Sequence, residues 1–212
     1  MKDLKKKHLE LLGKSAVAAL TKKHFLAQYV SDKKEALEEV LKLIKPGDTI
    51  GLPGSNTIVA IGLEKILKEK GHEIYNHQGL PKEEKRKIQR KELTSDVFIA
   101  SSNAITLDGK IINVDGAGNR VAGMIFGPNK VVIVVGANKV VKNEEEGRER
   151  IRLVAAPTNV ARFGLNNPCN VTGYCMDCDS PTRICCVTTV FERPMASGAD
   201  MHIIVVGEEL GF

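Results

Sequence analysis

Leucine, valine and isoleucine recur every three or four residues in the first part of the chain, the spacing that places them on one face of a helix. This pattern predicts helix over residues 4–44, with Ser31 or Asp32 capping a second helix inside that range. Pro46 and Gly47 follow, and we expect them to end the second helix.

Beyond residue 48, short apolar runs alternate with longer charged stretches. Uninterrupted apolar runs are typical of strands buried on both faces of a parallel sheet, and the stretches between them are long enough for crossover helices. The sequence therefore predicts an α/β fold with a mostly parallel, Rossmann-like sheet flanked by helices, preceded by an N-terminal helical segment. The expected strands are residues 49–52, 73–75, 96–101, 130–135 and 201–207, and the expected helices are residues 58–69, 81–92, 144–155 and one that starts near residue 120.

Turn signals interrupt the alternation in the second half of the chain. Asp108-Gly109 predicts a hairpin between two short strands, and the Gly-rich residues 115–119 predict a second tight turn. Pro157 is expected to stop or kink the helix that precedes it. Neither an internal repeat nor a Pro/Ser-rich linker divides the chain, so we expect a helical extension over residues 1–24 and one α/β domain over residues 25–212.

Composition then excludes several classes of protein. Hydrophobic residues make up 42% of the chain, which is enough for a buried core and excludes an intrinsically disordered protein. Aromatic residues make up 4%, without Trp, which argues against binding of single-stranded nucleic acid by base stacking. The run Val131–Val135 is too short to span a bilayer, and no apolar signal segment follows the charged N-terminus, so we expect a cytoplasmic location without a membrane span.

The net charge of +5 is unevenly distributed, because residues 1–92 contain 20 Lys and Arg against 13 Asp and Glu. A basic face can attract nucleic acid or anionic ligands over a long range. The sequence contains no recognised nucleic-acid-binding motif, so we interpret these charges as solvated helix surfaces and expect no nucleic-acid partner.

The first candidate for chemistry is the loop of residues 51–57, between a predicted strand and a predicted helix. Its glycines permit close approach of a ligand to the backbone, and free N–H groups at a helix start favour an anion. The alternative is a structural turn in which Ser55 caps the helix. The residues expected to bind a ligand here are Gly54, Ser55, Asn56 and Thr57.

Two further loops carry polar side chains after predicted strands, where open α/β sheets bind their ligands. Asp-Gly and Gly-Asn pairs are also what tight turns require, so turn chemistry is the alternative. Lys139 follows the strand over residues 130–135 and could face an anion in the same crevice. With it, the candidate ligand-binding residues of these loops are Asn103, Asp108, Asp115, Gly118, Asn119 and Arg120.

All five cysteines lie between residues 169 and 186, in the order Cys-x5-Cys-x2-Cys-x6-Cys-Cys. A Cys-x2-Cys pair lets two thiolates bind one metal, and two further thiolates would complete a set of four ligands. Neighbouring residues of an extended chain point in opposite directions, so only one member of the adjacent pair can join, and Cys185 is our choice. The spacing matches neither a zinc ribbon nor a ferredoxin, which leaves zinc and an iron–sulfur cluster both open, and buried reduced thiols are the alternative. The candidate metal ligands are Cys169, Cys175, Cys178 and Cys185.

The motifs of the polar loops resemble those of the lactate-utilisation (LUD) domain family, and the similarity covers about residues 20–212. The resemblance implies a fold similar to ribose-5-phosphate isomerase and the CoA transferases. It also implies a link to bacterial lactate oxidation alongside iron–sulfur partner subunits, most closely as the small C-type subunit, and it is compatible with a homo-oligomer. The segments that carry it are residues 102–109, 113–122, 126–128 and 134–139, with residues 51–57, 155–162 and the cysteine cluster in addition.

The sequence departs from both enzyme classes of that superfamily. In the isomerases an acidic pair follows Asp-Gly-Ala, whereas Gly118 and Asn119 follow Asp115-Gly116-Ala117 here, so the expected base is missing. The CoA transferases use a nucleophilic Glu, and no Glu occurs between Glu92 and Glu144. We therefore assign no catalytic residue from the sequence and leave open whether the chain is an enzyme.

The sequence thus predicts a subunit of lactate utilisation that binds a small anion, either an organic acid or a phosphorylated or CoA-type ligand. The alternative is a metal-binding subunit, with an iron–sulfur cluster or zinc, that transfers electrons or acts as a scaffold in an oxidoreductase complex.

Overall fold

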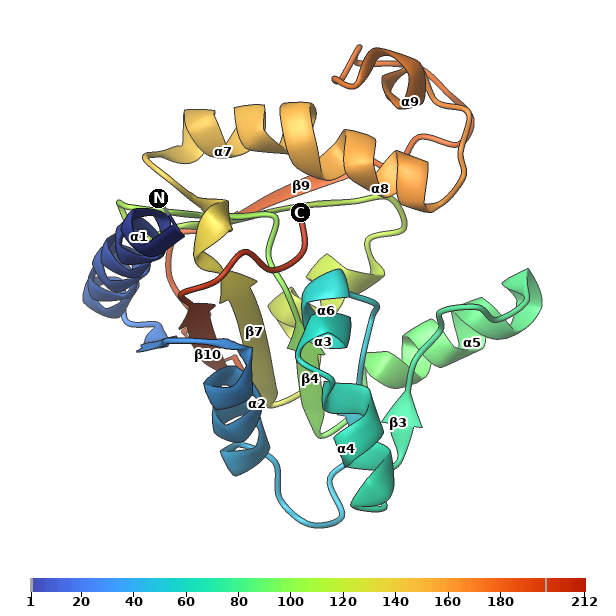
Figure 1. Cartoon of the computed structure of the whole chain (residues 1–212). Helices are drawn as coiled ribbons and strands as arrows, with labels where there is room; N and C mark the ends of the chain where they lie inside the picture. The colour runs from blue at the N-terminus through green and yellow to red at the C-terminus, as the bar shows by residue number, and fades with distance from the viewer. Residues whose placement is uncertain (1, 197) are drawn as a thin grey trace.

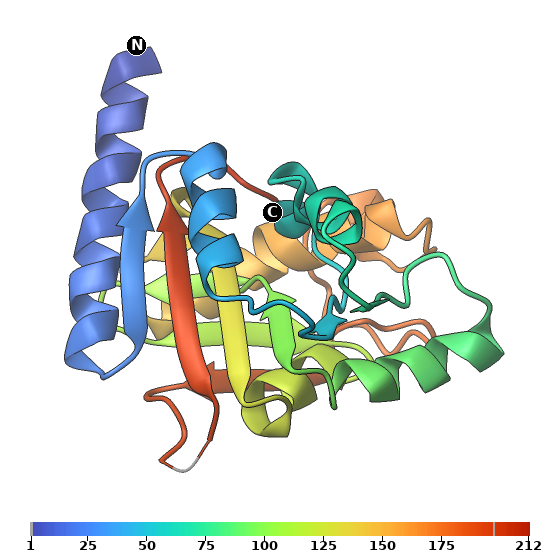
Figure 2. The same cartoon turned by 90° about the horizontal axis from the view of Figure 1, so that it is seen from below.

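A sheet of six parallel strands forms the centre of the protein, in a computed structural model that describes residues 2–196 and 198–212. Its order is β1-β10-β7-β4-β2-β3, and the four strands β1, β10, β7 and β4 lie side by side in Figure 2. The register is continuous, with Ile203 of β10 opposite Ile133 of β7. The strands are β1 (Leu26–Val30), β10 (Asp200–Val206), β7 (Lys130–Gly136), β4 (Val97–Ala100), β2 (Ile50–Gly51) and β3 (Ile74–Tyr75).

β-Branched residues dominate β7, and their alternation supplies both faces of the sheet. Val132 and Val134 belong to a core cluster under three helices on one face. Val131, Ile133 and Val135 belong to a second cluster on the opposite face. Both sets are fully buried, which explains why β7 has no polar position in its middle. The helices of the first face are α2 (Lys33–Lys42), α3 (Asn56–Ala60) and α4 (Leu63–Glu69).

A second sheet of four strands covers the other face, in the order β8-β5-β6-β9. Helices pack in turn on its outer side, where Ala104 and Ile112 form a third apolar cluster with Ile151 and Ala155. The result is four layers: helices, the parallel sheet, the mixed sheet, and the α7–α8 helices that run across the top of Figure 1. The elements are β5 (Ala104–Thr106), β6 (Ile111–Asp115), β8 (Val140–Val141), β9 (Val187–Phe191), α7 (Glu144–Arg150) and α8 (Ala156–Arg162).

Four helices and two short helical turns complete the described part of the fold. Helix α1 lies against the edge strand β1 at the side of the sheets, and its Ala16 and Leu20 are fully buried. Helix α5 extends outward on the opposite side, next to β3 (Figure 1). These remaining elements are α1 (Lys2–Lys22), α5 (Lys82–Glu92), α6 (Asn119–Phe126), α9 (Cys169–Thr172), the 3-10 turn η1 (Ala137–Lys139) and the π-helical turn η2 (Ile151–Ala155).

The α/β class, the mostly parallel sheet and the N-terminal helix are confirmed. The prediction of helix throughout residues 4–44 is wrong, because residues 26–30 form the edge strand β1 against β10. The segment Leu26–Val30 has no strong periodicity of its own, and its pairing with β10 decides its conformation. Helix α1 packs on the sheet. The expected division at residue 24, between a helical extension and the α/β domain, stays a prediction.

Two helix boundaries also differ from expectation. The helix predicted over residues 58–69 is broken into α3 and α4 at Gly62, which has φ +71°. The helix before Pro157 does not stop there: it continues through the π-helical turn η2 into α8, with Pro157 in the first turn of α8. Pro157 has no N–H to donate to the preceding turn, and the helix continues past it with a wider π-helical turn in place of α-helical geometry just before the proline. The strand β9 had no prediction from the sequence.

No helix among the described residues is long and apolar enough to cross a membrane.

A close contact between α6 and β4 gives a test of this packing. A Cβ atom on Gly123 would lie 2.4 Å from Cζ of Phe98, which is fully buried. We expect Gly123→Ala to lower the free energy of unfolding by about 1–3 kcal/mol, because the added methyl group overpacks the core. Urea unfolding measures the change, and Phe98→Leu in the same chain should restore part of the loss. The exposed Ala161→Ser is the control, and an equal effect of both substitutions would contradict the contact.

Candidate functional site

The carboxyl ends of neighbouring parallel strands meet at one edge of the central sheet. Thr57 follows β2, Ser101 follows β4, and Lys139 follows β7 in the turn η1. Residues 207–211 follow β10 and reach the same place. Because β10, β7, β4 and β2 are consecutive in the sheet, side chains far apart in the sequence become neighbours here.

The Lys139 side chain forms the centre of this group and is 3% exposed. Its Nζ donates hydrogen bonds to the hydroxyl oxygens of Thr57 and Ser101, both at 3.2 Å, and to the carbonyl oxygen of Ser102 at 3.3 Å. The Ser101 hydroxyl also donates to the Thr57 hydroxyl at 3.2 Å. Two hydroxyl groups and one carbonyl therefore surround the amine.

Burial lowers the pKa of Lys139 to about 7, and the positive charges of Arg150 and Arg120 add to this effect. Within the described residues no acidic side chain forms an ion pair with it or raises its pKa. A buried ammonium group without a counter-ion is costly, since buried charges are ordinarily paired. The amine is therefore close to half protonated at neutral pH, in a region of positive potential.

Arg150 approaches from α7, across the mixed sheet. Its Nη1 donates to the carbonyl oxygen of Asn103 at 2.6 Å, and its Nε to that of Asn138 at 3.4 Å. Burial lowers the pKa of Arg150, which remains charged because its ordinary value is so high. Both of its contacts are to uncharged carbonyls, so its positive charge adds to the field at Lys139.

The segment after β10 lies directly over this group. The Thr57 hydroxyl donates to the carbonyl oxygen of Leu210 at 3.3 Å, and the Leu210 N–H donates to Oδ1 of Asn138 at 3.1 Å. Gly211 has φ +61°, and a Cβ there would lie 2.7 Å from Oγ1 of Thr57 and 3.1 Å from Nζ of Lys139. Only glycine fits this conformation and this close approach, so residues 210 and 211 cover the amine.

The guanidinium of a second cation, Arg120, donates all of its hydrogen bonds to neighbouring residues. Its guanidinium donates to Oδ1 of Asp115 at 2.7 and 2.9 Å, to Oδ1 of Asn103 at 2.8 Å and to Oδ1 of Asn113 at 2.7 Å. It also donates to the carbonyl oxygens of Ser101 and Val114. The other oxygen of Asp115 accepts the N–H of Val121 in the first turn of α6. Asn103, Asp115 and Arg120 thus meet as predicted, but they bind one another.

The loop of residues 51–57 is divided between different partners. Ser55 caps α3 by accepting a hydrogen bond from the N–H of Ile58, which is the structural role that the sequence offered as the alternative to ligand binding. Asn56 accepts a hydrogen bond from Arg162 at 2.9 Å. Gly54, with φ +88°, packs against Gln78. A cavity of about 20 Å³ beside Gly54 and Ser55 is lined further by Glu64, Asn76 and Gln78, without Asn103 or Asn119. Of this loop, only Thr57 joins Lys139.

The remaining candidates lie at the margin or elsewhere. Gly118 and Asn119 are half-buried at the start of α6, beside Arg120. Asp108 is exposed in the β5–β6 turn, where it accepts the hydroxyl of Thr106. It therefore lies at the opposite end of β5 from Asn103, away from the amine.

Four residues of this region had no place among the sequence candidates: Ser101, Asn113, Asn138 and Arg150. Ser101 directly follows a buried strand, so the strand-end rule that selected Lys139 could have found it. Arg150 lies in a charged helix, and nothing in the sequence distinguishes it from the neighbouring surface charges.

A buried acid–base pair lies elsewhere, between α5 and the loop after β3. Nδ1 of His77 is 2.6 Å from Oε1 of Glu92, which also accepts the backbone N–H of His77 at 3.2 Å. The side chain of Glu92 is fully buried, and its Oε2 has no hydrogen-bond partner in the described structure. The pair anchors the end of α5 to the edge of the sheet.

The cysteines form a separate group beyond α8. Cys169 is buried in α9, whereas Cys175, Cys178 and Cys185 are half-buried and Cys186 is exposed. All five are free thiols. Across the described residues, no three His, Cys, Asp or Glu side chains already converge as a metal site.

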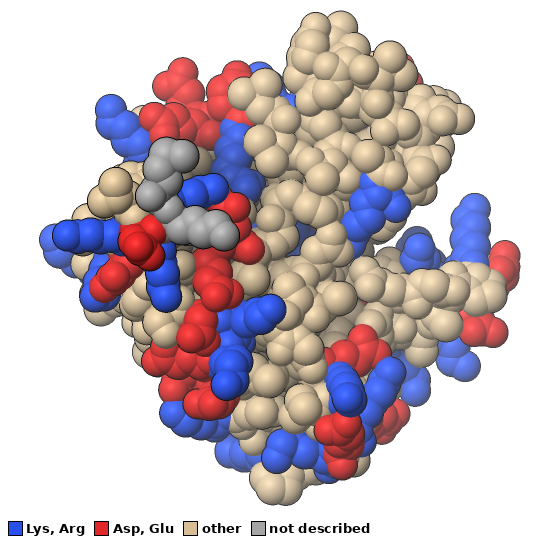
Figure 3. Space-filling model, in the orientation of Figure 1, with Lys and Arg blue, Asp and Glu red and all other residues tan. Residues whose placement is uncertain are grey.

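Charge is distributed unevenly over the surface. In the view of Figure 3 the α8–α9 end is mostly uncharged, whereas acidic and basic side chains are mixed around the α1 and α4 ends. The basic residues of the first half of the chain thus alternate with acidic ones on helix surfaces, as on α4 in the pair of Lys68 with Glu64.

The architecture and the site together define an α/β protein with a buried, unpaired lysine at the carboxyl edge of a parallel sheet. The sequence model of the LUD domain family matches residues 13–206, and the chain belongs to this family. No curated protein matches the sequence.

Two solved structures are similar to this chain, and the first of them supports the fold. A DUF162 family protein from Deinococcus radiodurans is similar over 95% of this chain and 97% of its own, with a TM-score of 0.53 and 14% identity. Ribose 5-phosphate isomerase A from Methanocaldococcus jannaschii matches 84% of this chain and 95% of its own, with a TM-score of 0.43 and 13% identity.

The Arg120 cluster predicts a large structural cost for its loss. We expect Arg120→Ala to lower the free energy of unfolding by about 3–5 kcal/mol, because it leaves the buried Asp115 carboxylate without its partner. Arg148→Ala, which removes an exposed pair with Glu144 in one turn of α7, should cost less than about 1 kcal/mol. Urea unfolding of both variants compares them, and similar losses would show that the cluster is not the stabilising feature.

The lowered pKa of Lys139 predicts a particular dependence of stability on pH. Between about pH 7 and pH 10.5 the folded amine is neutral while the unfolded one is protonated, so the folded state gains stability as the pH rises. The free energy of unfolding of the wild type, minus that of Lys139→Met, should therefore increase by up to about 1.4 kcal/mol per pH unit in that window. Below pH 7 the difference should level off. Parallel urea titrations measure it, and a difference independent of pH would contradict the burial of the amine.

Proposed function

We propose that the chain binds a small carboxylate, of the class of 2-hydroxy and 2-oxo acids, with Lys139 as the counter-ion. Membership of the LUD domain family suggests a role in lactate utilisation, and lactate and pyruvate are acids of this class. The observation that carries the proposal is the buried amine of Lys139, which is 3% exposed and has hydroxyl groups rather than a carboxylate around it.

The surroundings of the amine fit a carboxylate better than they fit a cation or an apolar ligand. The field of Arg150 and Arg120 is positive, so an anion is stabilised and a cation is repelled. The hydroxyls of Ser101 and Thr57 donate to Thr57 and to the Leu210 carbonyl, and each can redirect that hydrogen bond to a carboxylate oxygen or a ligand hydroxyl when residues 210 and 211 move aside. Arg120 itself is fully occupied by Asp115 and two asparagines, so it contributes charge and not a direct contact.

Access to the amine depends on the segment after β10. A Cβ on Gly211 would lie within 3.1 Å of both Oγ1 of Thr57 and Nζ of Lys139, so a ligand that reaches the amine takes the place of this backbone. The segment is held by two hydrogen bonds to Asn138 and one to Thr57. A few hydrogen bonds of about 1 kcal/mol each can be exchanged for an ion pair with the ligand.

Binding of an anion to a half-protonated amine has a signature that other sites lack. The carboxylate stabilises the ammonium form, so binding takes up a proton where the free amine is neutral. The affinity must therefore fall as the pH rises above about 7.

Titration calorimetry with lactate and pyruvate tests the proposal. We expect the dissociation constant to be about 30-fold higher at pH 8.5 than at pH 6, with proton uptake detected by comparing buffers of different ionisation enthalpy. Lys139→Met should weaken binding at least about tenfold at pH 6, by loss of the ion pair.

The matched control is Lys65→Met, whose side chain is 81% exposed on α4 and which should bind as the wild type does. Inorganic phosphate serves as the competing ligand. Binding of phosphate but not of either acid would assign the site to a phosphorylated ligand, and binding that is unchanged in Lys139→Met would place any ligand elsewhere.

A further inference from the structure

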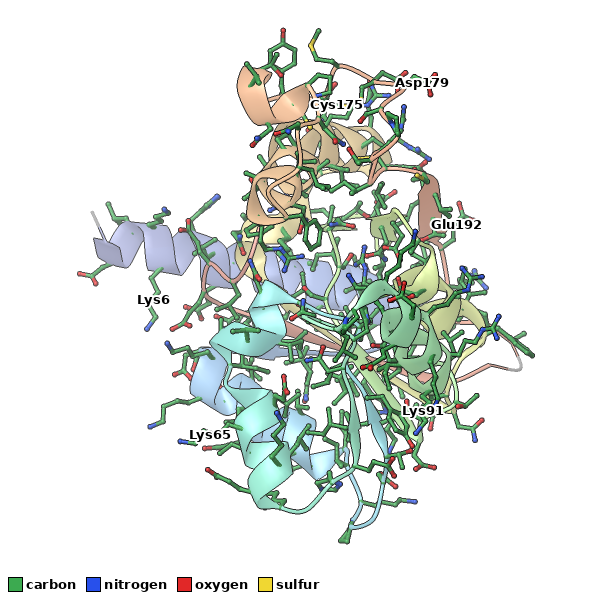
Figure 4. All side chains as sticks on the ribbon, turned by 90° about the vertical axis from the view of Figure 1, so that its right-hand side faces the viewer. Lys6, Lys65, Lys91, Cys175, Asp179 and Glu192 are labelled. Atoms are coloured by element: carbon green, nitrogen blue, oxygen red, sulfur yellow. The ribbon has the colours of Figure 1, made fainter. Side chains whose placement is uncertain are left out.

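The cysteine-rich segment projects from the end of α8 and takes no part in the site around Lys139. Figure 4 shows Cys175 and Asp179 at this projecting end, and Figure 1 shows α9 there, away from both sheets. Two hydrogen bonds hold the segment in place: the N–H of Cys175 donates to the carbonyl oxygen of Arg152 in η2 at 2.9 Å, and Nδ2 of Asn167 donates to that of Thr182 at 3.1 Å. A segment with so little apolar core needs another source of order.

The Cys175–Cys178 turn has the backbone of a metal-binding knuckle. The N–H of Asp177 points at the sulfur of Cys175, at 3.3 Å, and Asp177 has φ +47°, a left-handed conformation that residues other than glycine adopt at some cost. Backbone N–H groups directed at cysteine sulfurs stabilise the thiolate, which is the form that binds a metal.

Arg183 ties this turn to the second cysteine-bearing stretch. Its Nη1 donates to the carbonyl oxygen of Cys178 at 2.5 Å, and its Nε to that of Cys185 at 2.9 Å. Its Nη2 pairs with the carboxylate of Asp177 at 2.9 Å. One planar guanidinium therefore holds the backbones of Cys178 and Cys185 within reach of each other.

Four of the five cysteines lie partly or fully inside the segment. Cys169 is buried at the start of α9, and Cys175, Cys178 and Cys185 are half-buried. Cys186 is exposed, and its thiol donates to the carbonyl oxygen of Arg183 at 3.4 Å. The fifth thiol thus has a partner of its own, outside the group.

We infer that Cys169, Cys175, Cys178 and Cys185 bind one Zn²⁺ ion, and that Cys186 lies outside the site. Four thiolates without a histidine or an acidic side chain form the donor set of a tetrahedral structural zinc site. The spacing of the four cysteines matches neither a zinc ribbon nor a ferredoxin, so the choice of zinc rests on the donor set, and metal analysis distinguishes it from an iron–sulfur cluster.

Zinc binding would displace the thiol protons and draw the four sulfurs onto one ion. Among the described residues the thiols do not already converge as a metal site, so binding would move them together around the ion. The bound ion would then order residues 169–186 as a cross-link does, independently of any ligand at Lys139.

Metal analysis of the full chain, purified without chelators, tests the inference. We expect about one zinc per chain in the wild type and in Cys186→Ser, and less than about 0.1 in Cys178→Ser, because three thiolates hold the ion far more weakly. Equal zinc in Cys178→Ser and the wild type would overturn the assignment, as would iron with visible absorption in place of zinc.

Alkylation of the wild type provides a second measurement that does not depend on a variant that folds. After loading with Zn²⁺, iodoacetamide should modify Cys186 and spare the other four thiols, and a chelator should expose them. Mass spectrometry of the digested chain reads each site. Equal modification with and without Zn²⁺, or failure of the metal-free chain to take up Zn²⁺ or Co²⁺, would disprove the site.

Discussion

The arrangement of this protein depends on the parallel alignment of β10, β7, β4 and β2. Parallel strands end at one edge, so each connecting segment begins beside its neighbours. Here the four connections bring together Thr57, Ser101, Lys139 and the backbone of Gly211. Helix α7 closes the site from the opposite side, because Arg150 at its end donates to the Asn103 carbonyl just before β5. Burial of the Lys139 amine is a consequence of this convergence and not of its local sequence.

Two cations lie at this edge of the sheet, and they differ in their hydrogen-bond partners. The difference separates a structural role for Arg120 from the functional role proposed for Lys139. The planar fork of Arg120 matches a carboxylate and several carbonyl-type oxygens at once, and Asp115, Asn103 and Asn113 occupy it. Lys139 has no acidic partner among the described residues and meets hydroxyls instead. The charge paired with Asp115 stabilises the turn into α6, whereas the amine without an acidic partner is the basis of the proposed anion binding. The same lack of a partner makes the Lys139 amine responsive to pH near neutrality.

The cysteine-rich segment adds a second centre that is joined to the first through the backbone of β6. The N–H of Cys186 donates to the carbonyl oxygen of Asp115, the residue whose side chain holds Arg120. A cross-linked cysteine segment would therefore fix the start of β9, which pairs with β6 along its length.

The sequence by itself determined the α/β class, most of the strands and the candidate loops, because buried strands and tight turns leave local patterns of apolar runs, glycines and Asp-Gly pairs. It also singled out Lys139 and the cysteines, since a strand end and a dense cluster of one reactive residue are visible without coordinates. Only the tertiary structure decided that residues 26–30 are a strand, that Asp108 lies apart, and that Arg120 is saturated. Those outcomes depend on pairing and burial between segments separated by many residues. The charge that a lysine keeps, and whether it finds a partner, depend on neighbours that the local sequence does not contain.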